Sequence, residues 1–193
     1  MSDHENHHRR SIRLQDYDYT QCGAYFVTIC TYYHLGLFGD IVDNRMIVNE
    51  WGALVESCWG EIPAHYPMAE LDTFVVMPNH VHGIIVINDG NGGKKGRGMI
   101  YHAPTNTIAS SNNSLEKRNF SQPIANSLST IIGAFKAAVT RQINRLSDSP
   151  DHPVWQRNYY EHIVRSETSL NAIRAYIINN PARWTEDSLL MQT

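Results

Sequence analysis

The sequence has few cysteines and no long apolar run. Its three cysteines, Cys22, Cys30 and Cys58, are an odd number without Cys-x-x-Cys spacing, which argues against both a disulfide framework and a zinc site. No stretch approaches the ~20 apolar residues that span a bilayer, and the polar, histidine-rich N-terminus does not match a secretion signal. We therefore expect a cytoplasmic protein that is not inserted in a membrane.

An overall basic charge is also missing. The 16 Lys and Arg residues against 19 Asp and Glu residues give a formal net charge of -3, which is unusual for a protein that binds nucleic acid. The charge is unevenly distributed, however, because residues 94–145 hold eight Lys or Arg and one Asp or Glu. Such a segment is suited to contact nucleic-acid phosphates, whereas Lys94, Lys95 and Arg97 are better explained as residues that solubilise a loop. Three basic residues of a predicted helix are the segment's candidates for DNA contact: Lys136, Arg141 and Arg145.

The length of 193 residues fits a single domain with a sizeable core. Residues 1–20 are polar and charged and are expected to form a flexible tail. Residues 88–125 are dominated by Asn, Gly, Ser and Lys, which predicts a mobile insertion within a domain that spans residues 21–193.

Hydrophobic periodicity predicts the order strand, strand, helix, strand, strand, helix, strand, helix. The predicted strands are 24–31, 41–48, 70–77, 80–87 and a short strand near 160, and the predicted helices are 49–62, 126–146 and 167–180. This order indicates an α+β fold in which helices pack on one face of an antiparallel sheet.

His80 and His82 are the most informative residues of the chain. They begin a continuously apolar, β-branched run, so they are expected on a strand in the middle of the sheet. Residues two apart on a strand project from the same face, and two imidazoles side by side can bind one metal ion. Considered alone, two histidines on a strand are more often packing or surface residues.

A second candidate element is the predicted helix 167–180. Ser166 is a plausible N-cap, and Pro181 disfavours helical geometry at the preceding residue. Tyr176 and Asn180 are four apart and share one face of this helix, as a nucleophile and a metal ligand would. The alternative is that Tyr176 is a core residue and Asn180 a C-terminal cap.

The segment before this helix interleaves aromatic and basic side chains. Such a pattern suits base stacking and phosphate contact, although one of its tyrosines could instead be buried in a strand. Tyr159 and Tyr160 compete with Tyr176 as nucleophile candidates. The candidates for DNA contact in this segment are Arg157, Tyr159, Tyr160, His162 and Arg165.

Taken together, these segments resemble the single-tyrosine HUH transposases, and among them the REP-associated tyrosine transposases. The shared pattern is a His-hydrophobic-His strand followed by a helix with Tyr-x-x-x-Asn-Pro. Further matching pieces are Tyr25-Phe26-Val27-Thr28, Val76-Met77-Pro78-Asn79, Gly133-Ala134-Phe135-Lys136 and residues 155–162. The resemblance runs from about Tyr25 to Trp184, with a gap in the middle.

The resemblance implies a ferredoxin-like fold and a single-stranded DNA transesterase that depends on Mg²⁺ or Mn²⁺. Tyr176 would be the nucleophile, and His80, His82 and Asn180 would hold the metal. The partners would be single-stranded DNA hairpins, cut beside the hairpin through a 5′-phosphotyrosine link. Whether the tyrosine helix acts within a monomer or is exchanged in a homodimer stays open at this stage.

Three other functions are compatible with parts of the pattern. A hairpin-binding repressor without nuclease activity would be expected to lack a His or the Tyr, and all are present. A histidine-triad nucleotide hydrolase would need a third His where Ile84 stands. A metal-free interaction protein of the same fold is the remaining alternative.

Overall fold

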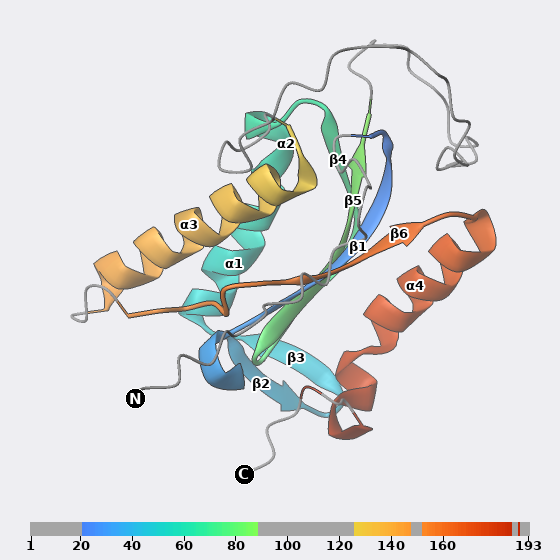
Figure 1. Cartoon of the computed structure of the whole chain (residues 1–193). Coiled ribbons are helices and arrows are strands. Elements are labelled where there is room, and N and C mark those ends of the chain that lie inside the picture. The colour runs from blue at the N-terminus through green and yellow to red at the C-terminus, as the bar shows by residue number, and fades with distance from the viewer. Residues whose placement is uncertain (1–20, 89–125, 148–151, 187–188, 190–193) are drawn as a thin grey trace, which may run out of the picture.

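The computed structural model describes residues 21–88, 126–147, 152–186 and 189. The predicted tail and nearly all of the predicted insertion lie outside these residues. The middle layer of the described part is a four-stranded antiparallel sheet in the order β4-β5-β1-β6 (Figure 1). Its strands are β4 (Ala69–Met77), β5 (His80–Ile87), β1 (Gly23–Cys30) and β6 (Tyr160–Val164).

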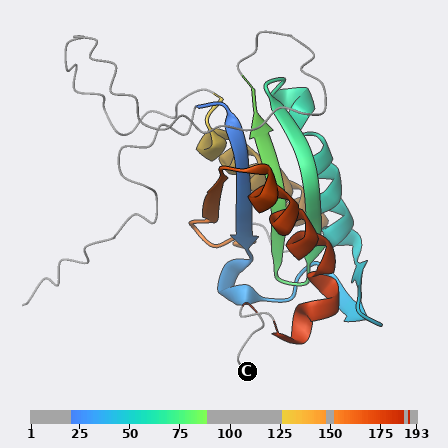
Figure 2. The same cartoon turned by 90° about the vertical axis from the view of Figure 1, so that its right-hand side faces the viewer.

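The predicted α+β class and its antiparallel sheet are confirmed. The succession β1-α1-β4-β5-α3-β6 is ferredoxin-like and puts α1 (Glu50–Gly60) and α3 (Leu128–Leu146) together on one face, as expected. The last helix, α4 (Glu167–Asn179), covers the opposite face, as Figures 1 and 2 show. None of the described helices is long and apolar enough to cross a membrane.

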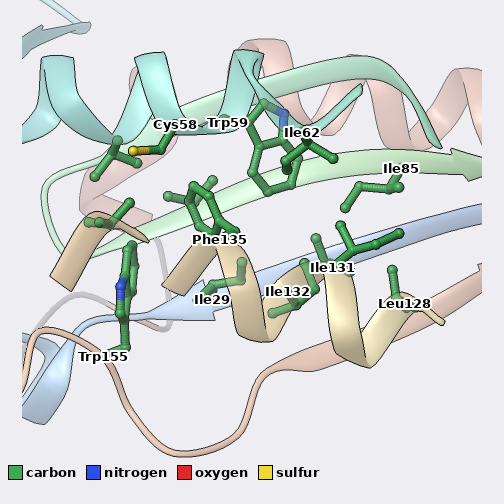
Figure 3. Packing of buried hydrophobic residues seen from close by; sticks show 14 of the residues in the cluster. Ile29, Cys58, Trp59, Ile62, Ile85, Leu128, Ile131, Ile132, Phe135 and Trp155 are labelled. Carbon is green, nitrogen blue, oxygen red and sulfur yellow. The ribbon is translucent and has the colours of Figure 1, made fainter. Parts of the chain in front are cut away.

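Most of the core lies between the sheet and the pair α1 and α3 (Figure 3). Alternation along β5 sends Val81 and Ile85 into this cluster, while Ile84 and Val86 enter a smaller cluster beneath α4. The predicted apolar stripe of α3 is buried in the larger cluster and comprises Leu128, Ile131, Ile132, Phe135, Val139 and Ile143.

The helix boundaries follow local signals in the sequence. Asn49 caps α1 by accepting a hydrogen bond from the Gly52 amide over 2.9 Å. The Ser166 hydroxyl accepts one from the Ser169 amide over 3.1 Å at the start of α4. The chain after α4 continues as a short 3-10 segment, η2 (Pro181–Glu186), because proline cannot extend the α-helix.

One predicted element was wrong. The single strand expected at 41–48 is a hairpin of β2 (Gly39–Val42) and β3 (Arg45–Val48). Asp43 and Asn44 between them have φ angles of 49° and 61°, as a two-residue turn that joins twisted strands requires. The dipeptide Asp-Asn was a readable turn signal. Three short elements were also missed, η1 (Tyr32–His34), α2 (Ile62–His65) and η2.

Gly83 is predicted to be intolerant of even one methyl group. A Cβ there would lie 2.3 Å from the Trp59 ring, which is fully buried between β5 and α3. We expect Gly83→Ala to lower the free energy of unfolding by about 1–3 kcal/mol through overpacking. Urea denaturation would measure this. Gly133→Ala on α3 is the control, because nothing lies within 4 Å of its Cβ and it should be neutral or stabilising.

Candidate active site

His80 and His82 project side by side from β5 towards the face that α4 covers. Their ring centroids are 4.4 Å apart, and their side chains are 0% and 2% exposed. The pair therefore has the geometry that strand alternation predicts. Burial, more than the nearby His34, lowers the pKa of His80 to about 3, and the neighbouring Asn180 side chain opposes this shift. The imidazole of His80 is consequently neutral at physiological pH, which is the form that binds metal ions.

Tyr176 of α4 reaches this pair within the same chain. Its hydroxyl oxygen lies 3.1 Å from Nε2 of His82, and the two ring centroids are 5.1 Å apart. The Phe26 ring meets the phenol edge to face at 6.0 Å and supports it from β1. The side chain is nevertheless 41% exposed, so Tyr176 is not a core residue.

Asn180 ends α4 and is buried beside His80. Its backbone amide closes the end of α4 by donating to the Ile177 carbonyl. Its side chain is 3% exposed and lies close enough to His80 to affect the pKa of that residue. Within the described part of the chain, Oδ1 of Asn180 meets no donor at hydrogen-bonding geometry. A buried amide oxygen in this state can accept a cation.

A cavity of about 510 Å³ opens beside Tyr176. Tyr159 and Tyr160 line it together with Tyr176 and His82, and Tyr160 is 53% exposed. Phe26 lies 6.4 Å from the Tyr160 ring, so one aromatic floor extends beneath the phenols from β1. The volume is within the range of small-ligand sites, and the aromatic walls suit a planar group such as a base.

A second hollow of about 970 Å³ lies between α3 and residues 153–157. Arg141, Arg145 and Arg157 line it and are exposed. Gln156 lines both hollows, so they adjoin at the backbone of this segment.

Lys136 behaves differently from these arginines. Its Nζ donates to the backbone carbonyls of Gln156, Arg157 and Asn158 over 2.5, 3.2 and 3.4 Å. Burial lowers the pKa of Lys136 to about 8. The ammonium group therefore holds the 156–158 backbone in place.

The last two candidates for DNA contact lie towards α4. His162 on β6 is exposed and stands opposite Phe26 in the register, on the same face as Tyr160. Arg165 is exposed in the link between β6 and α4.

Among the residues that the structure describes, no group of three or more His, Cys, Asp or Glu side chains could hold a metal ion. The expected ligand set is of another kind, two imidazoles and one amide. A neutral imidazole at His80, its neighbour His82 and the unsatisfied oxygen of Asn180 are donors that Mg²⁺ or Mn²⁺ accepts. These residues fit a divalent cation.

The fold matches that of a known transposase. The structure of a REP-associated tyrosine transposase bound to a REP hairpin aligns with a TM-score of 0.55, covering 90% of this chain and 74% of that chain at 14% identity. The chain has the fold of the REP-associated tyrosine transposases. The resemblance inferred from the motifs is thus confirmed at the level of the fold.

An uncharacterized protein of Haemophilus influenzae is 43% identical over 183 residues, which are 95% of this chain and 93% of that protein. The two proteins belong to one family. No family model matches the sequence.

Sequence reasoning missed several residues that the transposase fold places around the pair. Phe26 and Thr28 belong to a motif that was noted, and their role follows from strand pairing, because Thr28 stands opposite His82 in the register. Asn79 precedes the pair and contacts His80. His34 lines the tyrosine cavity from η1, and no local pattern in the sequence would have identified it.

An ion pair fastens α4 to the sheet. Arg174 binds Asp72 through Nε and Nη2, with distances of 2.9 and 2.5 Å to the two carboxylate oxygens. Asp72 lies at an irregularity of β4, where the register with β5 shifts. The hydrogen bond from Arg174 is the main reason that the pKa of Asp72 falls to about 2. Arg174 and Tyr176 lie on the same helix, so the ion pair helps to hold the helix that carries the phenol against the sheet.

The ion pair gives a pH-dependent prediction. The Asp72 pKa is depressed in the folded protein, so its stabilisation is present above about pH 4 and is lost as the pH falls towards 2. We expect Asp72→Asn to lower the free energy of unfolding by about 0.5–1 kcal/mol at pH 7, with the difference vanishing near pH 2. Denaturant titrations at both pH values would measure it. Glu167→Gln is the control, because Glu167 is exposed and 3.8 Å from Arg174.

Proposed function

We propose that the protein is a metal-dependent single-stranded DNA endonuclease and transposase that cleaves and rejoins DNA beside hairpins. The observation that carries the proposal is the 3.1 Å contact between the Tyr176 hydroxyl and His82, at the edge of an open aromatic cavity. The proposal is further supported by the fold, which the chain shares with a transposase whose structure was solved bound to a REP hairpin.

Tyr176 is the nucleophile in this proposal. Its phenolic oxygen attacks the phosphorus of one phosphodiester, forms a 5′-phosphotyrosine bond and releases the 3′-hydroxyl of the other fragment, which takes up a proton. A free phenol has a pKa of ~10, so the site must favour the phenolate. The phosphate stays activated on the protein, and a 3′-hydroxyl can attack it to rejoin DNA. Tyr159 and Tyr160 line the same cavity from the start of β6 and are assigned to base stacking.

His80, His82 and Asn180 would hold the divalent cation. When bound, Mg²⁺ or Mn²⁺ polarises a non-bridging phosphate oxygen and orients the phosphate for attack. Because the Tyr176 hydroxyl contacts Nε2 of His82, this contact would have to give way if that nitrogen held the cation. Phe26, which meets the phenol ring edge to face, would support Tyr176 from β1.

The exposed arginines of the second hollow are proposed to bind the phosphate backbone of the hairpin. Arg141, Arg145 and Arg157 face the same groove, and arginine pairs well with phosphate oxygens. His162 and Arg165 extend the surface on the α4 side. Lys136 is left out of this set because its ammonium group already serves three carbonyls.

The proposed unit is a single domain from residue 21 onwards that acts as a monomer. Tyr176 meets His82 in cis, so a second protomer is not needed to complete the site.

A hairpin-binding regulator without nuclease activity is the second candidate. The arginine groove favours it, because DNA binding there would not require Tyr176. Covalent capture of DNA separates the two functions.

Tyr176→Phe is predicted to abolish covalent DNA attachment while hairpin affinity stays within about threefold, because the hydroxyl is lost and the ring is kept. Single-stranded hairpins from the DNA that flanks the gene would be labelled on the 3′ side of the cut, incubated with Mn²⁺ and resolved on a denaturing gel. Wild-type protein should give a labelled band at protein mass. Tyr160→Phe is the matched control and should retain it. An adduct in Tyr176→Phe would mean that another residue is the nucleophile. Hairpin binding by the wild-type protein without any covalent adduct would favour the regulator.

The groove generates a separate prediction. Replacing both Arg141 and Arg145 by alanine should weaken hairpin binding and reduce the slope of log affinity against log salt by about one for each phosphate that is no longer neutralised. Fluorescence anisotropy between low and moderate salt would measure both quantities. Arg45→Ala on β3 removes an exposed arginine outside the groove and is the control. Equal slopes in the double variant and wild type would show that the groove does not bind the phosphate backbone.

A further inference from the structure

Each histidine of the pair uses its Nδ1 atom to contact a polar side chain behind it. Nδ1 of His80 lies 2.7 Å from Oδ1 of Asn79, and Nδ1 of His82 lies 2.8 Å from the Thr28 hydroxyl. Asn79 and Thr28 are 2% and 7% exposed, so water does not compete for these contacts. Neither residue belongs to the proposed nucleophile or ligand set.

The Asn79 amide has a defined orientation. Its Nδ2 donates to the carbonyls of His34 and Leu189, over 3.2 and 2.6 Å, and a carbonyl can only accept. The oxygen of the amide must therefore be the atom that faces His80. Because an amide oxygen also only accepts, Nδ1 of His80 carries the proton, and the lone pair of this neutral ring lies on Nε2.

Thr28 is placed by the sheet itself. It stands directly opposite His82 in the antiparallel pairing of β1 with β5, and its β-branched side chain has few rotamers. A hydroxyl can donate or accept, so this contact alone permits either tautomer of His82. The Tyr176 hydroxyl at Nε2 completes the chain of contacts, and it can donate to Nε2 only when Nδ1 holds the proton.

We propose that Asn79 and Thr28 are positioning residues that hold His80 and His82 in the Nδ1-protonated tautomer, with both Nε2 lone pairs directed to one divalent cation. The cation part of this inference rests on the proposed function. The tautomer part concerns the metal-free protein and stands without it. In metal sites generally, such orienting partners have about a 10–100-fold effect on metal affinity.

The tautomers are tested in the metal-free full-length chain. The chain would be labelled with ¹⁵N-histidine, and two-bond ¹H–¹⁵N spectra at neutral pH would identify the protonated nitrogen of each ring. His80→Ala and His82→Ala assign the signals. We expect wild-type protein to show a protonated Nδ1 at both positions. A protonated Nε2 at either histidine would overturn the inference there.

Thr28→Val is the decisive variant, because valine keeps the shape and removes the hydroxyl. The His82 signals should shift towards the other tautomer or a mixture, while those of His80 stay unchanged. Thr28→Ser should restore the wild-type pattern. Asn79→Ala should change His80 and leave His82 unchanged, which provides a second test if Thr28→Val fails to fold. Unchanged tautomers in the folded variants would overturn the positioning role.

Mn²⁺ affinity, measured by calorimetry without DNA, is the second readout. Thr28→Val should bind Mn²⁺ about 10–100-fold more weakly than wild type, and Thr28→Ser within about threefold. Equal affinity in Thr28→Val and wild type would overturn the cation part. If wild-type protein binds no Mn²⁺, the metal dependence of the proposed function fails, and the spectra still decide the role of Thr28 and Asn79.

Discussion

The register of β5 against β1 determines the rest of the structure. It sets His82 opposite Thr28 and His80 opposite Cys30, and a slip of one residue would turn both imidazoles to the other face. Gly83, the next residue, faces the opposite side, where the Trp59 ring occupies the space that a Cβ would need. Packing in the larger core cluster therefore fixes the position of β5. The same strand presents the two histidines on its other face, towards the smaller cluster beneath α4.

The helix that carries Tyr176 is attached through a small contact area. Leu170 and Ile177 are its only side chains in the buried clusters of the described residues, and Arg174 adds the ion pair with β4. A limited apolar contact lets an element open at a lower free energy than the core does. Tyr176 thus belongs to the long helix with the fewest buried residues, while the two histidines belong to a strand that is buried throughout.

Periodicity alone predicted much of the candidate site. Alternation along the strand put His80 and His82 on one face, and helical spacing put Tyr176 and Asn180 on one face of α4. The sequence could not predict which face of the sheet α4 covers, since both faces of β5 are apolar. The backbone contacts of Lys136 could not be predicted for a related reason. Its carbonyl partners lie about twenty residues later in an irregular segment, and no local pattern reveals such an interaction. The Asp43–Asn44 turn, in contrast, was readable and was overlooked.

The contacts of Lys136 bear on the distance between the arginine groove and the tyrosine cavity. The segment that it holds from behind separates the arginine groove from the tyrosine cavity, and Gln156 borders both. Three neighbouring carbonyls of this segment bind one ammonium group, so the segment is a rigid spacer between the two hollows. Under the proposed function, a DNA strand that occupied both hollows would reach Tyr176 at a set number of nucleotides from the paired stem. The folded chain would then act as a molecular ruler, and its length would be held by the Lys136 ammonium group behind the segment.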